Sequence, residues 1–315
     1  MVRPSFFSTP SIHLGILRHG WCRSLLAAGL IAACTSSMPV QAAAAAPATD
    51  SPDAIRLLVR ADDMGSCHSA NAAIVDCYRN GIVRSAEVIV PGPWFREAIT
   101  LLDENPGLDV GVHLTLTSEW DGLKWGPLTS APSLVDADGY FYPNVGEPGK
   151  AGSGCFGDAR PDEIERELHA QIELARRHIK HLTHLSTHMF HPQATPELQP
   201  ILQKLSNEYG LPFKPDGVRW LGDLGEWPKT TAAQKEDAMA AHLENATPGT
   251  WFFLEHPGDN SPEMQAMHVL PWYPNVAADR DGVTHLFTSP RIREIIARRH
   301  IQLISYADLI GEAKK

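Results

Sequence analysis

Short apolar runs alternate with stretches of helical periodicity along the chain after residue 50. The apolar runs have the length of buried strands, whereas the stretches between them repeat apolar residues at helical spacing. The predicted strands are Ile55–Arg60, Ser85–Val90, Leu108–Leu116, Leu182–His188, Val218–Leu221, Thr250–Glu255 and Ile301–Ser305. The predicted helices are His68–Arg79, Trp94–Leu102, Pro161–Lys180, Pro196–Tyr209, Thr231–Leu243 and Pro290–Arg299. Elements that alternate in this way predict parallel strands joined by crossover helices.

Two stretches without sustained periodicity interrupt the alternation, residues 118–160 and the residues from Gly258 to about Thr288. Loops this long in a compact domain are usually functional or disordered. We expect the first stretch to be inserted over the mouth of a site, where its aromatic residues face a sugar or, equally well, pack within a surface excursion. These aromatic residues are Trp120, Trp125, Tyr140, Phe141 and Tyr142.

The predicted fold class is α/β: a single irregular (β/α) barrel, TIM-barrel-like, with inserted loops at the C-terminal ends of its strands. The chain is 43% hydrophobic. Residues 51–315 are predicted to form one domain, because roughly 265 residues suit one large core better than two small ones. In such a barrel, working side chains lie at the carboxyl ends of the strands.

Residues 1–50 do not continue this pattern and are predicted to be an export signal and a flexible linker. Arg18 and Arg23 precede an apolar segment, residues 25–33, and a small-residue cleavage site lies near Ala42. The apolar segment is too short for a transmembrane helix, which needs about 20 residues. We therefore expect no transmembrane segment and an exported protein, either periplasmic or secreted.

Cys34 leaves a second ending of the signal open. The residues before it, Ile31-Ala32-Ala33, resemble a bacterial lipoprotein processing site. In that case Cys34 would carry a lipid anchor, and the Ala/Pro-rich stretch after it would be a tether. The sequence does not decide between this ending and cleavage near Ala42.

The charge of the chain argues against a nucleic-acid partner, and its cysteine content argues against a disulfide framework. Cleavage near Ala42 removes three arginines and no acids, so the net charge falls from −10 to −13. An acidic balance argues against a nucleic-acid partner, which favours a basic surface. The remaining cysteines, Cys67, Cys77 and Cys155, are sparse and odd in number, and we predict no disulfide framework. The sequence allows a homo-oligomer without indicating one.

Reactive side chains stand at four of the predicted strand ends. Two adjacent carboxylates follow the first strand, and histidines lie at the ends of three others. Because successive side chains of a strand alternate between its faces, His184, Ser186 and His188 share one face, and two imidazoles can enter one pocket. Carboxylate and imidazole ligands are typical of zinc and other divalent metal ions. The groups are Asp62, Asp63, His113, His184, His188 and His256.

This set of groups suits metal-assisted hydrolysis. A metal ion held by one carboxylate and two imidazoles acidifies a bound water and polarises a carbonyl oxygen. A second carboxylate can take the proton of the water, and a histidine on the far side can protonate the leaving group. The adjacent pair Asp62 and Asp63 would supply one ligand and one base.

Each group also has an ordinary structural interpretation. Aspartate before a helix is a favoured N-cap, so the following helix alone would explain Asp62 and Asp63. A single histidine is more often a surface or core residue than a ligand. The position of all these groups at four strand ends favours a shared site, although on spacing alone His184 and His188 are interchangeable.

Five short motifs, in this order, resemble the YdjC/ChbG-like carbohydrate deacetylases. The resemblance runs from about Ile55 to Leu309, and the ordered set is more specific than any one motif. The motifs are Ala61-Asp62-Asp63-Met64-Gly65, Asn80-Gly81-Ile82-Val83-Arg84-Ser85, Gly111-Val112-His113-Leu114-Thr115-Leu116, Thr183-His184-Leu185-Ser186-Thr187-His188 and His256-Pro257-Gly258.

The resemblance implies an irregular (β/α) barrel and metal-dependent removal of N-acetyl groups from amino sugars, with chitooligosaccharides as the best-known substrate class. Carried over by position, Asp63, His113 and His188 would bind the divalent ion, zinc or magnesium. Asp62 would be the general base on the metal-bound water, and His256 would be the general acid for the amine.

Two residues depart from the family pattern. Ser186 stands where the family usually has an aspartate, which can orient a metal-binding imidazole. Loss of such a partner typically costs about 10- to 100-fold in metal affinity or activity. Met64 in place of the more common phenylalanine is a milder change. The resemblance also implies that His184 does not bind the metal ion but helps to hold the metal-binding residues in place.

The leading hypothesis is therefore an exported metal-dependent N-deacetylase acting on an acetylated amino-sugar substrate. A glycan-binding barrel that has lost turnover through Ser186 is one alternative, and the intact Asp and His set weighs against it. A metal-dependent esterase or amidase on another acyl substrate is the second alternative.

Overall fold

The computed structural model describes residues 53–146, 150, 154–190, 198–213 and 217–313. The predicted export signal, the cleavage site near Ala42 and the lipid-anchor site Cys34 lie outside the described residues. Among the described residues, no helix has the length and apolar character needed to cross a bilayer.

In the described part of the chain, parallel strands form one sheet with the order β4-β3-β2-β1-β6-β5, and β7 also pairs with β1. β1 is central, because β6 follows one of its edges while β7 and β2 pair with its first and last residues. The strands are β1 Ile55–Met64, β2 Ser85–Val88, β3 Asp109–Leu114, β4 Leu182–Thr187, β5 Arg219–Trp220, β6 Gly249–Glu255 and β7 Gln302–Ile304.

The sheet is a curled half-barrel, which agrees with the predicted irregular (β/α) barrel except that the barrel is only partial. No ladder joins β4 to β5 among the described residues. β5 has two residues, and β7 has three and pairs with β1 instead of extending an edge. The predicted α/β class with parallel strands is confirmed, but the sheet has too few long strands to close on itself.

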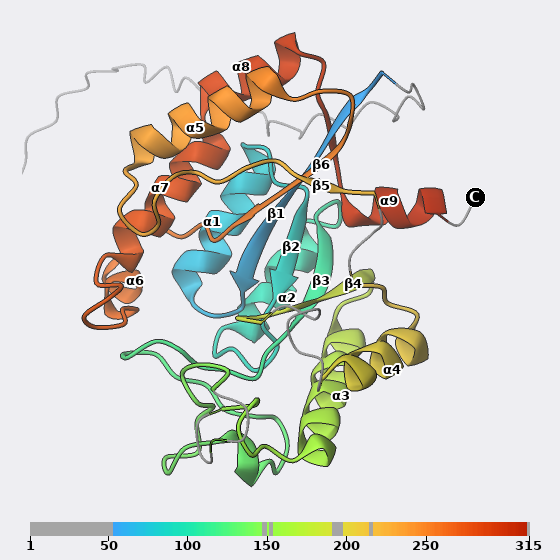
Figure 1. Cartoon of the computed structure of the whole chain (residues 1–315), viewed down its shortest axis with the longest axis vertical. Helices are drawn as coiled ribbons and strands as arrows, with labels where there is room; N and C mark the ends of the chain where they lie inside the picture. The colour runs from blue at the N-terminus through green and yellow to red at the C-terminus, as the bar shows by residue number, and fades with distance from the viewer. Residues whose placement is uncertain (1–52, 147–149, 151–153, 191–197, 214–216, 314–315) are drawn as a thin grey trace, which may run out of the picture. The chain divides into compact units, whose positions relative to one another are not determined.

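Helices flank this sheet. Figure 1 shows α5, α7 and α8 grouped together, and α3 with α4 beside the β4 edge. The helices are α1 His68–Arg79, α2 Phe95–Glu104, the 3₁₀ helix η1 Pro132–Leu134, α3 Pro161–His178, α4 Gln199–Tyr209, α5 Ala232–Asn245, α6 Pro262–Ala266, α7 Val276–Thr288, α8 Pro290–Arg298 and α9 Tyr306–Ala313.

α3 illustrates why the predicted helices form. It begins at Pro161, carries Asp162 and Glu163 in its first turn and Arg176 and Arg177 in its last turn. Proline suits the first turn, and this order of charges complements the helix dipole. The apolar side of the helix packs near β3, which carries one of the candidate histidines.

The second long stretch was predicted to be irregular, and this prediction was wrong. It contains α6 and α7, and α7 buries Asp279, Arg280 and Thr284 along with apolar residues. Asp279 accepts a hydrogen bond from the Tyr273 hydroxyl at 2.7 Å and pairs with Lys235 at 2.8 Å. A helix whose buried side is partly polar has no continuous apolar stripe to mark it in the sequence.

α1 begins directly after Cys67, whose Sγ accepts a hydrogen bond from the Ala70 N–H at 3.3 Å. The N-cap interpretation of the aspartate pair is therefore wrong, and these carboxylates are available for another role. Cys67, Cys77 and Cys155 are free and buried.

Candidate metal centre

The aspartate pair lies at a β-bulge near the end of β1. Between Ala61 and Met64, β1 contains one residue more than the matching segment of β2. Asp63 has a left-handed backbone with φ of 72°, which is uncommon for a residue other than glycine. In a regular strand two adjacent side chains point to opposite faces. The bulge instead allows both Asp62 and Asp63 to line one pocket.

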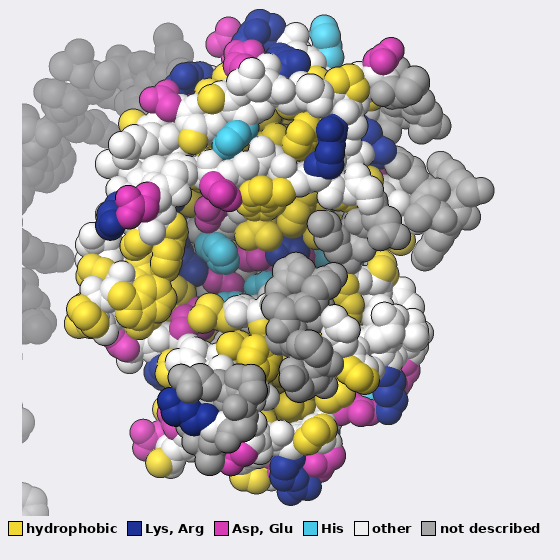
Figure 2. Space-filling model, viewed as in Figure 1, with side chains coloured by type: hydrophobic (Ala, Val, Ile, Leu, Met, Phe, Trp, Pro, Cys, Tyr) yellow, Lys and Arg dark blue, Asp and Glu magenta, His cyan; other side chains and the backbone are white. Residues whose placement is uncertain are grey.

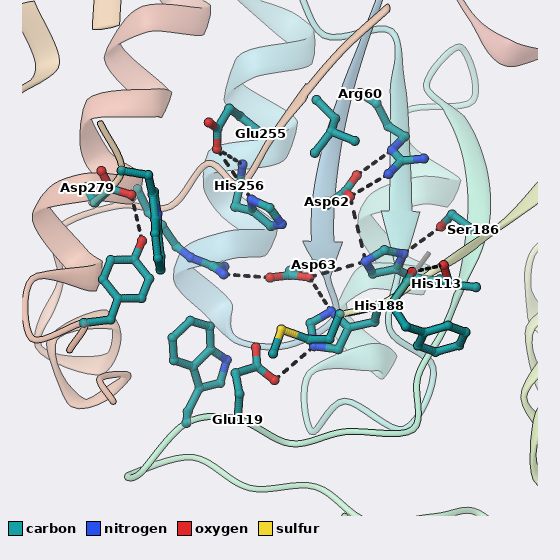
Figure 3. Close-up of a pocket in the computed structure, with 18 of the residues that line it drawn as sticks. Arg60, Asp62, Asp63, His113, Glu119, Ser186, His188, Glu255, His256 and Asp279 are labelled. Atoms are coloured by element: carbon teal, nitrogen blue, oxygen red, sulfur yellow. Dashed lines mark hydrogen bonds and ion pairs between the residues drawn. The ribbon is translucent and has the colours of Figure 1, made fainter. Parts of the chain in front are cut away.

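This pocket has a volume of about 560 Å³ and lies where the predicted strand ends meet. Figure 2 shows the hollow, with histidine and acidic side chains at its floor and hydrophobic side chains at its rim. Figure 3 shows how the side chains of the floor converge on Asp63. All five residues predicted to be catalytic or to bind metal line it, namely Asp62, Asp63, His113, His188 and His256.

Asp63, His113 and His188 meet at the floor of the pocket. Each offers one ligand atom, and these atoms lie within 4.8 Å of one another. Asp63 Oδ1 is 3.6 Å from His113 Nε2 and 3.2 Å from His188 Nδ1. The three side chains are buried and come from the ends of β1, β3 and β4. The structure thus brings together the residues that the family resemblance implies as ligands.

The hydrogen bonds of Asp63 test whether a metal ion fits. Its Oδ2 accepts a hydrogen bond from Arg280 Nη2 at 2.7 Å. Its Oδ1 is buried and has no hydrogen-bond partner among the described residues. It lies 3.2 Å from His188 Nδ1, at ion-pair distance but without a hydrogen bond, and a buried charged oxygen without a hydrogen bond is costly. A divalent cation beside this oxygen and the two imidazoles would satisfy it, and the donor set suits zinc with open positions for water. The residues therefore fit a divalent ion.

The two candidate histidine ligands differ in charge. Burial and the nearby His188 lower the pKa of His113 to about 3, so its imidazole is neutral. Burial also opposes the charged form of His188, but the Glu119 and Asp63 carboxylates raise its pKa to about 10. Glu119 Oε2 lies 3.0 Å from His188 Nε2. This contact leaves Nδ1 of His188 facing Asp63.

Asp62 is held by a bidentate ion pair with Arg60. Arg60 Nε donates to Asp62 Oδ1 at 2.7 Å, and Nη2 donates to Oδ2 at 2.8 Å. Such a pair fixes the plane of the carboxylate. A carboxylate has about four lone-pair sites, so Asp62 can still accept a proton or hydrogen bond from the pocket. Its Oδ2 is 3.8 Å from His113 Nε2, so it lies beside the ligand cluster.

His256 follows β6 and enters the pocket across Asp63 from His188 (Figure 3). Although burial opposes its charged form, the Asp63 and Glu255 carboxylates raise the pKa of His256. Its imidazole is therefore easier to protonate than an ordinary histidine and suits a proton donor.

His184 does not line this pocket. Its Nε2 lies 2.5 Å from Glu87 Oε1, and its ring stacks on Tyr306 at a centroid distance of 3.8 Å. The structure therefore places His188, and not His184, beside Asp63. Burial opposes the ionised form of Glu87, but His184 and Arg60 hold the pKa of its carboxyl below the usual value.

Comparison with known proteins identifies a family whose match includes all of these site residues. Residues 56–298 match the family described as YdjC-like protein. The chain belongs to the YdjC-like family. A carbohydrate deacetylase of Thermus thermophilus is 30% identical over 78% of this YdjC-like chain and 90% of its own length. One of Listeria monocytogenes is 32% identical over 81% of this chain and 100% of its own length.

A third relative, the carbohydrate deacetylase of Brevibacillus brevis, is 29% identical over 81% of this YdjC-like chain and 100% of its own length. A crystal structure of an Enterococcus faecalis protein shares the fold. Its TM-score is 0.65 at 21% identity, and the match covers 81% of this chain and 99% of that one.

Four charged residues around the site of this YdjC-like chain escaped the sequence prediction: Arg60, Glu87, Glu119 and Arg280. Arg60 and Glu87 each interrupt a buried apolar strand, and a charge there needs a partner. That signal was visible in the sequence. Glu119 and Arg280 lie in the two stretches without periodicity, where no pattern locates them.

The aromatic residues expected to face a sugar have different positions. Of the five, Trp120 alone lines the pocket. Trp125 and Phe141 are buried in the core. Trp227 and Trp272, which the sequence did not single out, line the pocket and are exposed.

Proposed function

We propose that this YdjC-like chain is a divalent-metal-dependent carbohydrate deacetylase that removes N-acetyl groups from acetylated amino sugars such as chitooligosaccharides. The observation that carries the proposal is the buried Asp63 Oδ1, which makes no hydrogen bond among the described residues and lies beside His113 and His188, with Asp62 and His256 in the same pocket. The three relatives named carbohydrate deacetylase, which align over most of this chain, support the substrate class.

In the proposed mechanism, Asp63, His113 and His188 hold a zinc or magnesium ion. When bound, the ion polarises the amide carbonyl and makes a water more acidic. Asp62 takes the proton of the attacking water at its carboxylate, while Arg60 keeps that carboxylate in position.

His256 then donates a proton to the amide nitrogen as the carbon–nitrogen bond breaks. The products are acetate and the free amino sugar. The raised pKa of His256 supports this role, since the residue must carry a proton before the bond breaks.

The rim of the pocket favours an oligosaccharide over a single sugar. Trp227 and Trp272 are 51% and 54% exposed, and their rings pack edge to face with centroids 5.6 Å apart. Both line the same pocket as the ligand cluster. Exposed indole faces at a pocket entrance offer apolar surface with a polar N–H handle, which suits a sugar ring.

The geometry favours catalysis over simple glycan binding. Sugar binding alone does not require a buried carboxylate oxygen that makes no hydrogen bond, nor a second buried carboxylate beside it. The esterase or amidase alternative uses the same groups, so comparison of O-acetyl with N-acetyl substrates distinguishes it from the proposed reaction.

The test of the proposed function is acetate release by the purified protein from N-acetylglucosamine oligomers and peptidoglycan fragments. Zinc, nickel, cobalt and magnesium are each supplied at stoichiometric concentration. We expect acetate release that a chelator abolishes and the metal restores. If no acetate is released from any of these substrates with any of these ions, the substrate assignment is wrong.

Replacement of Asp62 tests the mechanism. We expect Asp62→Asn to lower kcat by about 10²- to 10⁴-fold, because the variant cannot take the proton of the water. Zinc affinity should stay within about threefold of wild type, because Asp62 is not a proposed ligand. Asp162→Asn, which changes an exposed carboxylate on α3, is the matched control. Unchanged turnover in Asp62→Asn would contradict the assigned base.

We also propose that the chain acts outside the cytoplasm, periplasmic or secreted, as the pattern of residues 1–50 predicts. The mass of the mature N-terminus, measured after cell fractionation, separates lipidation at Cys34 from cleavage near Ala42. An uncleaved chain in the cytoplasmic fraction would overturn the proposal.

A further inference from the structure

A buried hydrogen-bond chain connects Glu87 with His113. Ser186 Oγ donates to Glu87 Oε2 at 2.5 Å, and the same Oγ lies 2.6 Å from His113 Nδ1. Figure 3 shows the contact of Ser186 with His113 on the side of the imidazole away from Asp63. Glu87 is 0% exposed and His113 is 2% exposed, so bulk water does not compete for these bonds.

The donors and acceptors fix the direction of the hydrogen bonds from His113 through Ser186 to Glu87. An ionised carboxylate only accepts hydrogen bonds, so Glu87 takes the single hydroxyl proton of Ser186. Ser186 Oγ is then left to accept, and the proton between it and His113 belongs to His113 Nδ1. An imidazole protonated at Nδ1 has its lone pair at Nε2. That nitrogen is the one that lies 3.6 Å from Asp63 Oδ1, in the ligand cluster.

Arg60 stabilises the charge on which this direction depends. Its Nη1 lies 3.5 Å from Glu87 Oε1, while its other nitrogens hold Asp62. The buried guanidinium of Arg60 therefore stabilises both the Glu87 carboxylate and the Asp62 carboxylate.

We propose that Glu87 is a positioning residue that acts through Ser186 to fix the His113 tautomer able to bind the metal ion. The inference rests on the proposed metal-dependent function. In this chain the carboxylate that orients a ligand imidazole stands on β2 and reaches His113 through a serine hydroxyl, whereas the position next to His113 on β4 is uncharged. With Ser186 at this position, His113 is therefore still oriented by a carboxylate.

Glu87→Gln tests this inference with little change of shape. The new amide oxygen still accepts from His184, but the amide nitrogen donates to Ser186 Oγ. Ser186 can then donate its own proton to His113 Nδ1, which favours the tautomer with Nε2 protonated and unable to bind a metal. We expect the dissociation constant for Zn²⁺ to rise about 10- to 100-fold.

The matched control is Glu167→Gln. Glu167 is also 0% exposed and also accepts from a hydroxyl, that of Thr129 at 2.8 Å, but it lies outside the pocket. Zn²⁺ affinity is measured by competition with a chromophoric chelator, and thermal unfolding of each metal-free variant is recorded alongside. We expect the control to lose stability without losing Zn²⁺ affinity.

Two further variants separate positioning from a merely structural role. Ser186→Ala breaks the connection, so Glu87→Gln should change Zn²⁺ affinity less than about threefold in that background. The double variant Glu87→Gln with Ser186→Asp places a carboxylate directly beside His113, and the new amide can donate to it. We expect this double variant to recover Zn²⁺ affinity to within about fivefold of wild type.

The outcomes are distinct. Wild-type protein that binds neither Zn²⁺ nor Mg²⁺ overturns the proposed function and this inference together. Wild-type binding with Glu87→Gln unchanged in Zn²⁺ affinity overturns only the role of Glu87. A full effect of Glu87→Gln in the Ser186→Ala background overturns the route through Ser186.

Discussion

At the residue scale, the two imidazoles beside Asp63 carry different charges although both are buried. His188 contacts two carboxylates, Glu119 at 3.0 Å and Asp63 at 3.2 Å. His113 has the Ser186 hydroxyl on one nitrogen and a more distant Asp63 oxygen, at 3.6 Å, on the other. Without a metal ion, His188 is therefore protonated on both ring nitrogens and His113 is neutral. A metal ion that binds here must displace the extra proton of His188.

This difference predicts the pH dependence of metal binding. With the pKa of His188 raised to about 10 and that of His113 lowered to about 3, one proton leaves on binding at neutral pH. Zn²⁺ affinity should rise about tenfold per pH unit between about pH 6 and pH 9, because falling proton concentration removes the competitor. Chelator competition across this range gives the slope.

A slope of two would mean that both imidazoles are protonated, and a slope of zero would mean that neither is. Glu119→Gln serves as the comparison, since it removes the carboxylate with the largest effect on His188. The slope in that variant should flatten at lower pH than in wild type.

At the element scale, the sequence located the elements that bury a regular apolar face. α1 has the predicted bounds, and β1 and α3 differ only near an end. α7 escaped because its buried side includes Asp279, Arg280 and Thr284. The bulge in β1 escaped for a different reason: it is defined by pairing with β2, and no local pattern within β1 reports on that partner.

The loops that carry Trp227 and Trp272 also lie outside any periodic pattern, and their role can be measured. We expect Trp227→Ala to raise KM for an N-acetylglucosamine trimer about tenfold, because the variant loses an aromatic contact to a second sugar ring. The value of kcat, and KM for the monosaccharide, should change less than about twofold. Steady-state acetate release gives both constants.

Trp94→Ala is the control for this prediction, since Trp94 is 37% exposed and lies outside the pocket. Equal losses on the trimer and the monosaccharide would contradict a separate contact at the rim.

At the scale of the whole described fold, the candidate ligands lie on the half of the sheet that runs from β1 to β4. Asp63 is on β1, His113 on β3, and His188 directly follows β4 at the sheet edge. The sequence could predict that these strand ends meet, because parallel strands place their carboxyl ends on one side. It could not predict that the sheet stays open, because closure depends on pairing between β4 and β5, which are distant in the chain.

An ion shared by three strands should stabilise the fold. At a free Zn²⁺ concentration 100 times the dissociation constant, binding adds about 2.7 kcal/mol to the free energy of unfolding. For a domain of this size we expect a rise in Tm of about 5–10 °C. Differential scanning fluorimetry with zinc, and then with excess chelator, measures the rise and its reversal.

Asp63→Asn should show little of this rise, because the variant lacks the carboxylate ligand. A wild-type Tm that does not respond to zinc would contradict a shared zinc ion, whatever the activity of the protein.

The bulge in β1 also has a consequence for how the gene can change. Deletion of a single codon between Ala61 and Met64 would give β1 and β2 equal lengths and restore regular pairing. The same deletion would leave one carboxylate where the pocket now has two. The pairing of the sheet therefore does not require this extra residue, whereas the proposed chemistry does. We expect a relative whose sequence has a gap at this position to keep the fold and to lack the second carboxylate of the pocket.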